Sequence, residues 1–275
     1  MAADSEIYKM EERQSPARGI LHPASMAGQT VHRRYLPCNA LAEWIEHFWI
    51  VEWNFGSSSK LVSTLPHPSV HITISADESA VGGIGTGRFV RTLSGRGRVF
   101  GIKFLPGAFY PWFRLPVSSI ANKKLPLGSF FNNADAFEAA MLDLQAHQDL
   151  VKCAETALLK QVPESDSRLI QVRRICETIC SNRKLLRVEQ ICADENLSIR
   201  QLQRLFSLWV GVSPKWMIQR YRLHEVVEEL NAAQTPPDWI SLAEKLGYFD
   251  QAHFIRDFKR LIGETPAAYS ASSIR

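Results

Sequence analysis

The sequence lacks any long run of apolar residues. Although 45% of its 275 residues are hydrophobic, no segment reaches the roughly 18 consecutive apolar residues that a transmembrane helix needs. The densest candidate, residues 41–55, is interrupted by Glu43, Glu46 and Glu52. The first 19 residues also lack the apolar segment of a signal peptide. We therefore expect a globular protein in the cytoplasm with no membrane partner.

The chain is also short of residues that hold cofactors. Its five cysteines are scattered and form no Cys-x-x-Cys pair, which is typical of a reduced protein without a disulfide framework. Cys176 and Cys180 share one face of an expected helix, but further metal ligands are missing, and we interpret them as small buried hydrophobic residues. The glycines between 82 and 87 are followed by no Lys-Ser or Lys-Thr pair, so they favour a hairpin over a phosphate-binding loop. No cofactor and no catalytic residue is predicted.

Positive charge is in slight excess and unevenly divided. Residues 168–275 contain 16 Lys and Arg and 12 Asp and Glu, whereas residues 1–167 contain 16 of each. The whole net charge of +4 therefore lies in the second part of the chain. A surplus of this size is compatible with an ordinary solvated surface and also with a polyanionic partner.

The first part of the chain shows the patterns of an arm followed by a sheet. Residues 1–35 are polar and without period, which predicts a poorly ordered arm. After Asn39, apolar residues recur with helical spacing at Leu41, Trp44, Ile45 and Phe48, which predicts an amphipathic helix. Alternation with a period of two predicts strands over residues 49–55, 61–65, 70–75 and 98–104. We expect a sheet-rich domain over residues 36–162.

This domain is expected to end in a long helix. Residues 135–162 are almost free of Gly and Pro and rich in Ala, Leu, Glu and Gln. The helix can form a dimerisation surface or pack on its own sheet, and the sequence favours neither. Residues 163–167 interrupt the pattern and predict an interdomain linker that caps the next helix. Residues 168–275 show no strand-like alternation and predict an all-α domain.

The all-α domain contains an internal repeat. The segment LSIRQLQRLFSLWVGVSPKW, residues 197–216, shares five positions with FDQAHFIRDFKRLIGETPAA, which begins at Phe249, and each pair lies 52 residues apart. The pairs are Arg204 and Arg256, Phe206 and Phe258, Gly211 and Gly263, Ser213 and Thr265, and Pro214 and Pro266. A constant offset over five positions indicates duplication rather than an ordinary helical hairpin.

Each copy has the pattern of a helix-turn-helix motif. In the first, Ser198 and Gln201 form a capping box, and Leu202, Leu205 and Phe206 form the buried face. Helix 188–196 precedes this helix. In the second copy, Asp238 caps helix 239–246, and after a turn at Gly247, Asp250 caps the helix that carries Arg256; Phe254, Phe258 and Leu261 face inward.

The outward residue types suit DNA. Arg can bond guanine O6 and N7 together, and Gln can pair similarly with adenine. A single outward arginine is most simply a solvated one, but its recurrence in both copies favours base contact. Lys215, Lys259 and Arg260 are better placed for phosphates.

A helix over residues 214–231 is expected to join the copies. Its 18 residues span roughly 27 Å at about 1.5 Å each. Successive major grooves on one face of DNA lie about 34 Å apart. One chain can therefore hold two recognition helices near this spacing without a dimer.

These motifs resemble the AraC/XylS family of transcription regulators over residues 168–270. The resemblance rests on Arg204-Leu-Phe206 with Gly211-Val-Ser-Pro214, on Ile240-Ser-Leu-Ala-Glu-Lys-Leu-Gly-Tyr248, and on Asp250-Gln-Ala-His-Phe254 with Gly263-Glu-Thr-Pro266. It implies double-stranded DNA and RNA polymerase as partners. The base contacts that it implies are Arg200, Gln203 and Arg204 in the first recognition helix and Gln251, Ala252 and Arg256 in the second.

Some positions depart from the family pattern. Arg187 stands where a small polar cap is usual, Val226 where alanine is usual, and Glu228 and Glu229 where basic residues are usual. Ala252 has no side-chain hydrogen-bonding group. We therefore expect the first helix to carry more of the base readout.

The sheet-rich domain gives a weaker signal. Residues 35–127, with Pro66-His-Pro68 and the run from Phe104 to Phe109, are similar to an uncharacterised domain attached to such regulators, which implies a cupin-like sensor. Its aromatic residues form either an ordinary core or the pocket of a small-molecule effector. The candidate pocket residues are Trp49, Trp53, Phe104, Phe109 and Trp112. His67 and His71 share a strand face, but no third metal ligand is evident, and we interpret them as structural.

The sequence thus predicts an α+β protein, with a sheet-rich, cupin-like domain followed by an all-α domain that carries two helix-turn-helix motifs. We predict a sequence-specific DNA-binding regulator and not an enzyme, controlled by an effector, a partner or homodimerisation. The alternatives are a metal-dependent cupin-like enzyme or a DNA-repair protein with an appended DNA-binding module, and a ligand-free interaction protein.

Overall fold

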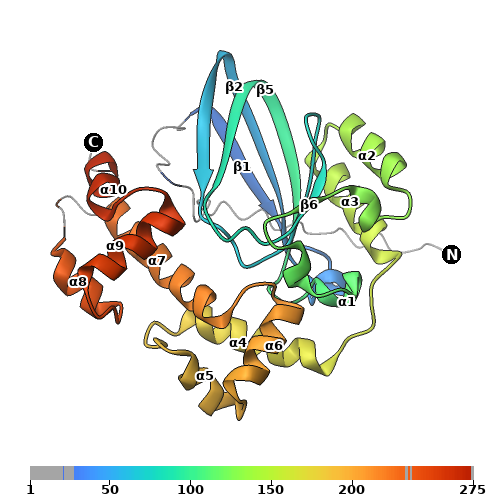
Figure 1. The fold of residues 1–275 in the computed structure, drawn as a ribbon. Helices are drawn as coiled ribbons and strands as arrows, with labels where there is room; N and C mark the ends of the chain where they lie inside the picture. The colour runs from blue at the N-terminus through green and yellow to red at the C-terminus, as the bar shows by residue number, and fades with distance from the viewer. Residues whose placement is uncertain (1–20, 22–27, 233–234, 236, 274–275) are drawn as a thin grey trace.

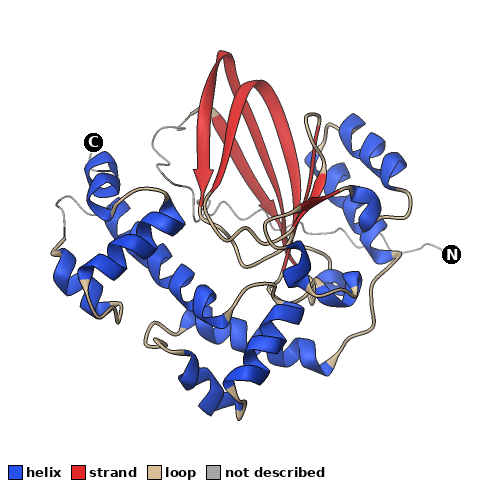
Figure 2. Cartoon of the chain, viewed as in Figure 1, coloured by secondary structure: helices blue, strands red, loops and turns tan. Residues whose placement is uncertain are grey.

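A single antiparallel sheet forms the centre of the molecule (Figures 1 and 2). The computed structural model describes residues 21, 28–232, 235 and 237–273. The strands, in spatial order, are β1 (Thr30–Tyr35), β2 (Ile45–Thr64), β5 (Phe89–Phe104), β3 (His71–Ser75), β4 (Ala80–Gly82) and β6 (Lys124–Leu125). β2 and β5 form a long antiparallel pair that extends away from the helices (Figure 1). The sheet-rich first part of the fold is therefore as predicted.

The helix predicted after Asn39 is wrong. The chain forms only a short 3-10 helix, η2 (Asn39–Leu41), and β2 begins at Ile45. The pairing of β2 with β5 shifts register between Ile45 and His47. A bulge adds one residue to a strand, so Ile45 and Phe48 both face the core although they are three residues apart. This spacing imitates that of a helix.

Two loop predictions are also corrected. Most of the predicted arm lies outside the described residues, but Thr30–Tyr35 form the edge strand β1, paired with β2. The glycines between 82 and 87 do not turn a hairpin, because they connect β4 to β5 and these strands are not neighbours in the sheet. Segment 83–88 instead runs toward the helical part of the chain, where Thr86 contacts Trp216.

The predicted long helix is two helices, α2 (Ala134–Asp143) and α3 (His147–Leu159). The guanidinium of Arg98, on β5, donates hydrogen bonds to the carbonyl oxygens of Leu144 and Gln145 at the break. This long-range contact satisfies backbone groups that a continuous helix would pair internally. Each helix buries one apolar face in the core of this domain, with Phe137 and Met141 in α2 and Leu150 and Leu158 in α3. Homodimerisation through this region stays a prediction.

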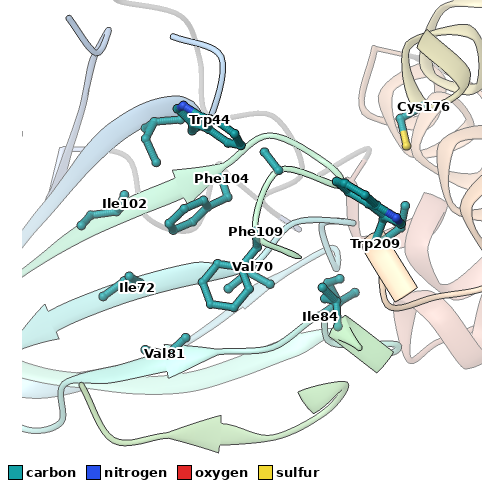
Figure 3. Close-up of a cluster of buried hydrophobic side chains, with 14 of the residues drawn as sticks. Trp44, Val70, Ile72, Val81, Ile84, Ile102, Phe104, Phe109, Cys176 and Trp209 are labelled. Atoms are coloured by element: carbon teal, nitrogen blue, oxygen red, sulfur yellow. The ribbon is translucent and has the colours of Figure 1, made fainter. Parts of the chain in front are cut away.

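The hydrophobic core continues from the sheet into the helices that follow. Residues 162–166 form neither helix nor strand, and we call residues 28–159 the sheet domain and residues 167–273 the helical domain. One buried cluster contains Phe104 and Phe109 of the sheet domain together with Cys176 and Trp209 of the helical domain (Figure 3). The sheet domain also contributes two short elements to this junction, α1 (Tyr110–Phe113) and η3 (Val117–Ile120). The rings of Tyr110 and Trp209 lie 4.6 Å apart.

Gly211 lies at this junction and has a positive φ of 92°. A Cβ atom there would lie 2.8 Å from Val117 Cγ1 and 2.9 Å from Ile84 Cδ1. We expect Gly211→Ala to lower the free energy of unfolding by roughly 2–4 kcal/mol, because backbone strain and overpacking combine. Urea denaturation measures the loss. The matched control is Gly56→Ala, since Gly56 has a φ of 56° but no atom within 4 Å of a built Cβ; equal losses at the two positions would contradict the packing argument.

Candidate nucleic-acid interface

The helical domain consists of two helix-turn-helix units on a central helix (Figure 1). It begins with α4 (Ser167–Ser181), and the first unit is α5 (Val188–Glu195) with α6 (Ile199–Trp209). The central helix is α7 (Pro214–Ala232). The second unit is α8 (Trp239–Lys245) with α9 (Gln251–Ile262), and α10 (Pro266–Ser273) follows.

The predicted caps set the start of both recognition helices. Ser198 Oγ accepts a hydrogen bond from the Gln201 N–H at 3.2 Å, and Gln201 Oε1 accepts one from the Ser198 N–H at 2.8 Å. Asp250 Oδ1 accepts a hydrogen bond from the His253 N–H at 2.7 Å. Such caps satisfy backbone donors that have no partner within the helix. The sequence therefore fixes the register in which each helix presents its outer face.

The first recognition helix, α6, exposes the predicted base-reading residues. Arg200, Gln203 and Arg204 are exposed, whereas Leu202 and Phe206 are fully buried. Ser207 belongs to the same exposed face, because residues four apart on a helix lie side by side. The sequence argument missed Ser207, although its spacing from Gln203 and Arg204 could have identified it.

The second recognition helix, α9, exposes fewer polar groups. Ala252 and Arg256 are exposed, and Gln251 is half-buried. The Nε atom of Arg256 donates to the carbonyl oxygen of Ala252 at 3.3 Å, which draws the side chain back along its own helix. Phe254, Phe258 and Leu261 are buried beneath, as the sequence predicts.

Two of the three predicted phosphate-binding residues share a cleft. Lys215 on α7 and Arg260 on α9 line a cleft of about 480 Å³. Its remaining lining residues are Thr86, Gly87, Ser213, Trp216, Gln219, His253 and Asp257. Lys259 is exposed outside this cleft. Thr86 and Gly87 belong to the sheet domain, so the cleft lies between the two domains.

Asp257, at the base of the cleft, was not identified from the sequence. This residue is 5% exposed, and its carboxylate accepts hydrogen bonds from Gln219 Nε2 and an Arg260 guanidinium nitrogen, both at 2.8 Å. The contact ties α9 to the central helix α7. Arg260 is thereby held over the cleft, while Lys215 belongs to none of the ion pairs among the described residues.

A second unpredicted residue, Arg220, connects α7 to the sheet domain. It is 3% exposed, and its Nε atom donates to the Pro66 carbonyl oxygen at 2.7 Å. A terminal nitrogen of Arg220 lies 3.4 Å from His67 Nδ1. A buried cation therefore joins the central helix to the segment before β3.

A cluster of ionisable side chains lies beside this contact. The ammonium group of Lys103 lies 2.9 Å from Glu46 Oε1. Burial alone would raise the pKa of Glu46, but the hydrogen bond from His47 and the charge of Lys103 lower it to about 2. Burial, reinforced by Lys103, lowers the pKa of His71 to about 3, and the same two causes lower the pKa of His67. Both imidazoles are therefore neutral at pH 7.

The candidate effector-pocket residues do not surround one cavity. Trp49 and Trp53 project from one face of β2, over Gly101 and Gly97 of β5. Phe104 and Phe109 lie in the core on the other face, where they contact each other edge to face, and Trp112 packs edge to face against Phe104. None of the five lines either of the two principal clefts in the described part of the chain. The sequence alone could not show that these residues lie on different faces of the sheet, because the face that each residue of β2 occupies depends on the register of the strand.

Among the described residues, no group of three His, Cys, Asp or Glu side chains is arranged to hold a metal ion. No helix in the same part of the chain is sufficiently long and apolar to cross a bilayer.

Each part of the chain matches a known family. Residues 191–272 match a family described as "Helix-turn-helix domain", and residues 33–126 match a "Domain of unknown function" (DUF6597). No curated protein matches the chain. Among solved structures, the chain is similar to ToxT from Vibrio cholerae, at 13% identity and a TM-score of 0.36, over 93% of this chain and 99% of that one. ToxT bound to an unsaturated fatty acid matches at 13% identity and a TM-score of 0.35, over 88% and 95%.

Proposed function

We propose that this DNA-binding transcription regulator, whose helix-turn-helix domain is of the AraC type, reads its operator by inserting α6 and α9 into successive major grooves. The observation that carries the proposal is the recurrence of one exposed arginine, Arg204 and Arg256, at the same position of both recognition helices. Each arginine lies in a helix with a capped N-terminus. A phenylalanine two residues later is buried on the opposite side of the same helix.

The base contacts that we propose are those implied by the helix faces. In α6, Arg200 and Arg204 can each offer a planar pair of donors to guanine, and Gln203 can offer one donor and one acceptor to adenine. In α9, Gln251 and Arg256 offer donors, and Ala252 can contact a thymine methyl group. Lys215, Lys259 and Arg260 are proposed to contact phosphates, which supply affinity and position rather than sequence preference.

The length of α7 supports binding by a single chain. Its 19 residues span roughly 28 Å at about 1.5 Å per residue, which is close to the separation of about 34 Å between successive grooves. Asp257 and Gln219 fix α9 against this helix. Both recognition helices are therefore attached to a single helix, whose length suits the separation of two successive major grooves.

Footprinting tests the arrangement. The probe is a duplex that the full chain selects from a random-sequence library, mixed with the protein at a ratio of one chain per duplex. Hydroxyl-radical cleavage is expected to show two protected tracts about 10 base pairs apart on one face of the DNA. One tract only, or two tracts that require two chains, would contradict the proposal.

The sheet domain is proposed to control this activity. It contacts α6, α7 and the end of α9 through segments near Ser118, Thr86 and Arg88. A small-molecule effector, a second copy of the chain or RNA polymerase can act on the helical domain through these contacts. The effector is proposed to bind the sheet domain.

A further inference from the structure

Phe249, in the turn between α8 and α9, is fully exposed. Its exposed fraction is 99%, whereas Leu61, the next most exposed large hydrophobic residue in the described part of the chain, is 67% exposed. The packing of the fold therefore makes no use of this ring. Because removal of apolar surface from water is favourable, the ring is available to bind a partner.

The position of Phe249 commonly has a structural role, which is absent here. Asp250 is the N-cap of α9, so Phe249 immediately precedes the cap. An apolar residue at this position often packs against the fourth residue of the helix, which in α9 is Phe254. The ring of Tyr248 lies 5.5 Å from that of Phe254. Tyr248 therefore makes the contact that Phe249 would be expected to make.

The equivalent position of the first motif is packed. With the offset of 52 residues between the two copies, Phe249 corresponds to Leu197, which precedes Ser198, the N-cap of α6. Leu197 is half-buried and packs against the hydrophobic core that contains Leu202, the fourth residue of α6. The exposed ring is thus a feature of the second motif and not of the duplicated unit.

The backbone on both sides of Phe249 is held in place. The Tyr248 N–H donates a hydrogen bond to the Ala243 carbonyl oxygen at 3.0 Å. On the other side, Asp250 Oδ1 accepts one from the His253 N–H at 2.7 Å. The ring therefore projects from a defined point, and a preorganised contact loses less entropy when it binds a partner.

This point lies at the end of α9 that meets base edges in the proposed function, because the N-terminal residues of a recognition helix contact the bases. In Figure 1, the turn between α8 and α9 lies at the lower edge of the second motif, and the turn between α5 and α6 lies at the lower edge of the first. Both turns thus face the same side of the helical domain. DNA that contacts both recognition helices on this side lies beside Phe249.

The second recognition helix is also less polar than the first at equivalent positions. Exposed Ala252 replaces Arg200 of the first motif. Half-buried Ile255 replaces Gln203. Thymine is the base that carries a methyl group in the major groove, and apolar side chains, phenylalanine included, make contact with it. The N-terminal end of α9 therefore fits thymine methyl groups better than polar base edges.

We propose that Phe249 is a specificity-determining residue that packs on the 5-methyl group of thymine at the edge of the sequence contacted by α9. This proposal rests on the proposed function above. The two motifs then recognise different chemistry. The first reads hydrogen-bonding groups through Arg200, Gln203 and Arg204, whereas Phe249 and Ala252 of the second read methyl groups. The chain consequently binds its operator in only one orientation.

Deoxyuridine in place of thymidine tests the proposal, because it forms the same base pair but lacks the methyl group. Each thymine of the selected duplex is replaced singly, and binding of the full chain is measured by fluorescence anisotropy. We expect binding to weaken by about 4-fold at one or more thymines of a single protected tract, since burial of one methyl group changes affinity by about this factor. Footprinting of Arg256→Ala, which should lose protection in the same tract, assigns that tract to α9.

The variant Phe249→Ser should no longer distinguish thymine from uracil at these positions. Its binding to the original duplex is expected to fall by about 5- to 20-fold, because ring surface is no longer removed from water. Its urea midpoint should equal that of the wild type, since the ring is fully exposed in the free protein. A lower midpoint would show that the residue has a structural role, and would contradict the proposal.

A matched control and the salt dependence separate this contact from other effects. The control is Ile170→Ser on α4, outside both motifs, where Ile170 is 60% exposed; it should keep the full preference for thymine over uracil. The ratio of the two affinities should also be the same at about 50 mM and about 200 mM salt, because an apolar contact releases no counterions. A ratio that falls with salt would indicate a contact with phosphate instead, and the proposal would fail.

The outcomes also separate this proposal from the proposed function. If no thymine in the tract of α9 depends on its methyl group, or if that tract contains no thymine, Phe249 does not read this group, although the protein still binds DNA. If Phe249→Ser keeps the wild-type preference, another residue contacts the methyl group and the proposal is wrong. If the full chain selects no duplex, the proposed function fails, and this proposal fails with it.

Discussion

Replacing both Arg204 and Arg256 by alanine is expected to abolish most of the preference of this protein for its selected duplex. A bidentate contact between arginine and guanine is worth about 1–3 kcal/mol of discrimination, so two such contacts are worth about 2–6 kcal/mol. This corresponds to a loss of specific affinity between about 30-fold and about 20,000-fold. Gel-shift titration of the selected duplex against a scrambled one measures the change.

The control must remove an exposed arginine elsewhere. Arg183 is suitable, because it lies before the first helix-turn-helix unit and its side chain is 77% exposed. Its guanidinium pairs with Glu225. Arg183→Ala should lower binding to both duplexes slightly and equally. If the double variant kept the full difference between the duplexes, the recognition helices would not read bases through these arginines.

The single variants should rank in the same experiment. Arg204→Ala is expected to relax specificity more than Arg256→Ala, because α6 exposes Arg200 and Gln203 beside Arg204 and α9 has only the short side chain of Ala252 in the corresponding region. The opposite ranking would show that α9 is the principal reader.

Acid is expected to destabilise the fold strongly between about pH 6.5 and pH 4. His67 and His71 have a lowered pKa in the folded protein, to about 3 in the case of His71. Below the ordinary pKa of about 6.5, the unfolded chain binds protons that the folded chain does not. The free energy of unfolding therefore falls by about 1.4 kcal/mol for each pH unit and each imidazole that stays neutral.

The free energy of unfolding is expected to fall in two successive pH ranges. The contribution of the two imidazoles is complete above their unfolded pKa and is lost as the pH falls. Glu46, whose pKa is lowered to about 2, stabilises the fold above its unfolded pKa, and this stabilisation is lost at still lower pH. Besides burial, Lys103 disfavours protonation of both imidazoles and Arg220 that of His67, whereas the Glu46 carboxylate favours protonation of His71.

Urea denaturation at several pH values measures this dependence. The variant His71→Asn removes one titrating group and should flatten the fall between pH 6.5 and pH 4 by up to about 1.4 kcal/mol per unit. His147→Asn, at a position outside this cluster, serves as the control. An unchanged slope in His71→Asn would show that the folded protein binds this proton as readily as the unfolded chain does.

The helical domain could be predicted because its signals are local. Ser198 and Asp250 cap the helices that they precede, and Pro214 begins α7, as the sequence indicates. For the sheet domain, the predictions were wrong where contacts with residues distant in the sequence determine the local structure. The bulge near Ile45 gives apolar residues a spacing like that of a helix. Arg98 donates a hydrogen bond to the Leu144 carbonyl oxygen, at a break in a segment whose composition favoured one continuous helix.

The contacts between domains could not be read from the sequence at all. Arg220 occupies an ordinary position in a helix, and only the fold brings it within 2.7 Å of the Pro66 carbonyl oxygen. The same is true of the contact between the hydroxyl groups of Ser118 and Ser207, which are 89 residues apart in the chain. Serine and glycine are uncharged, and isolated serines and glycines form no periodic pattern in the sequence, so nothing in the sequence indicates such a partner.

The core that the sheet domain shares with α4 and α6 also determines how such a chain can be recombined. An exchange of the first 162 residues for another domain would cut through one apolar interior and expose Trp209 and Cys176 to water. The second motif packs mainly within its own cluster, around Phe254 and Phe258. The unit that can be transferred intact is therefore the sheet domain together with the first motif, because the second motif has a largely separate core.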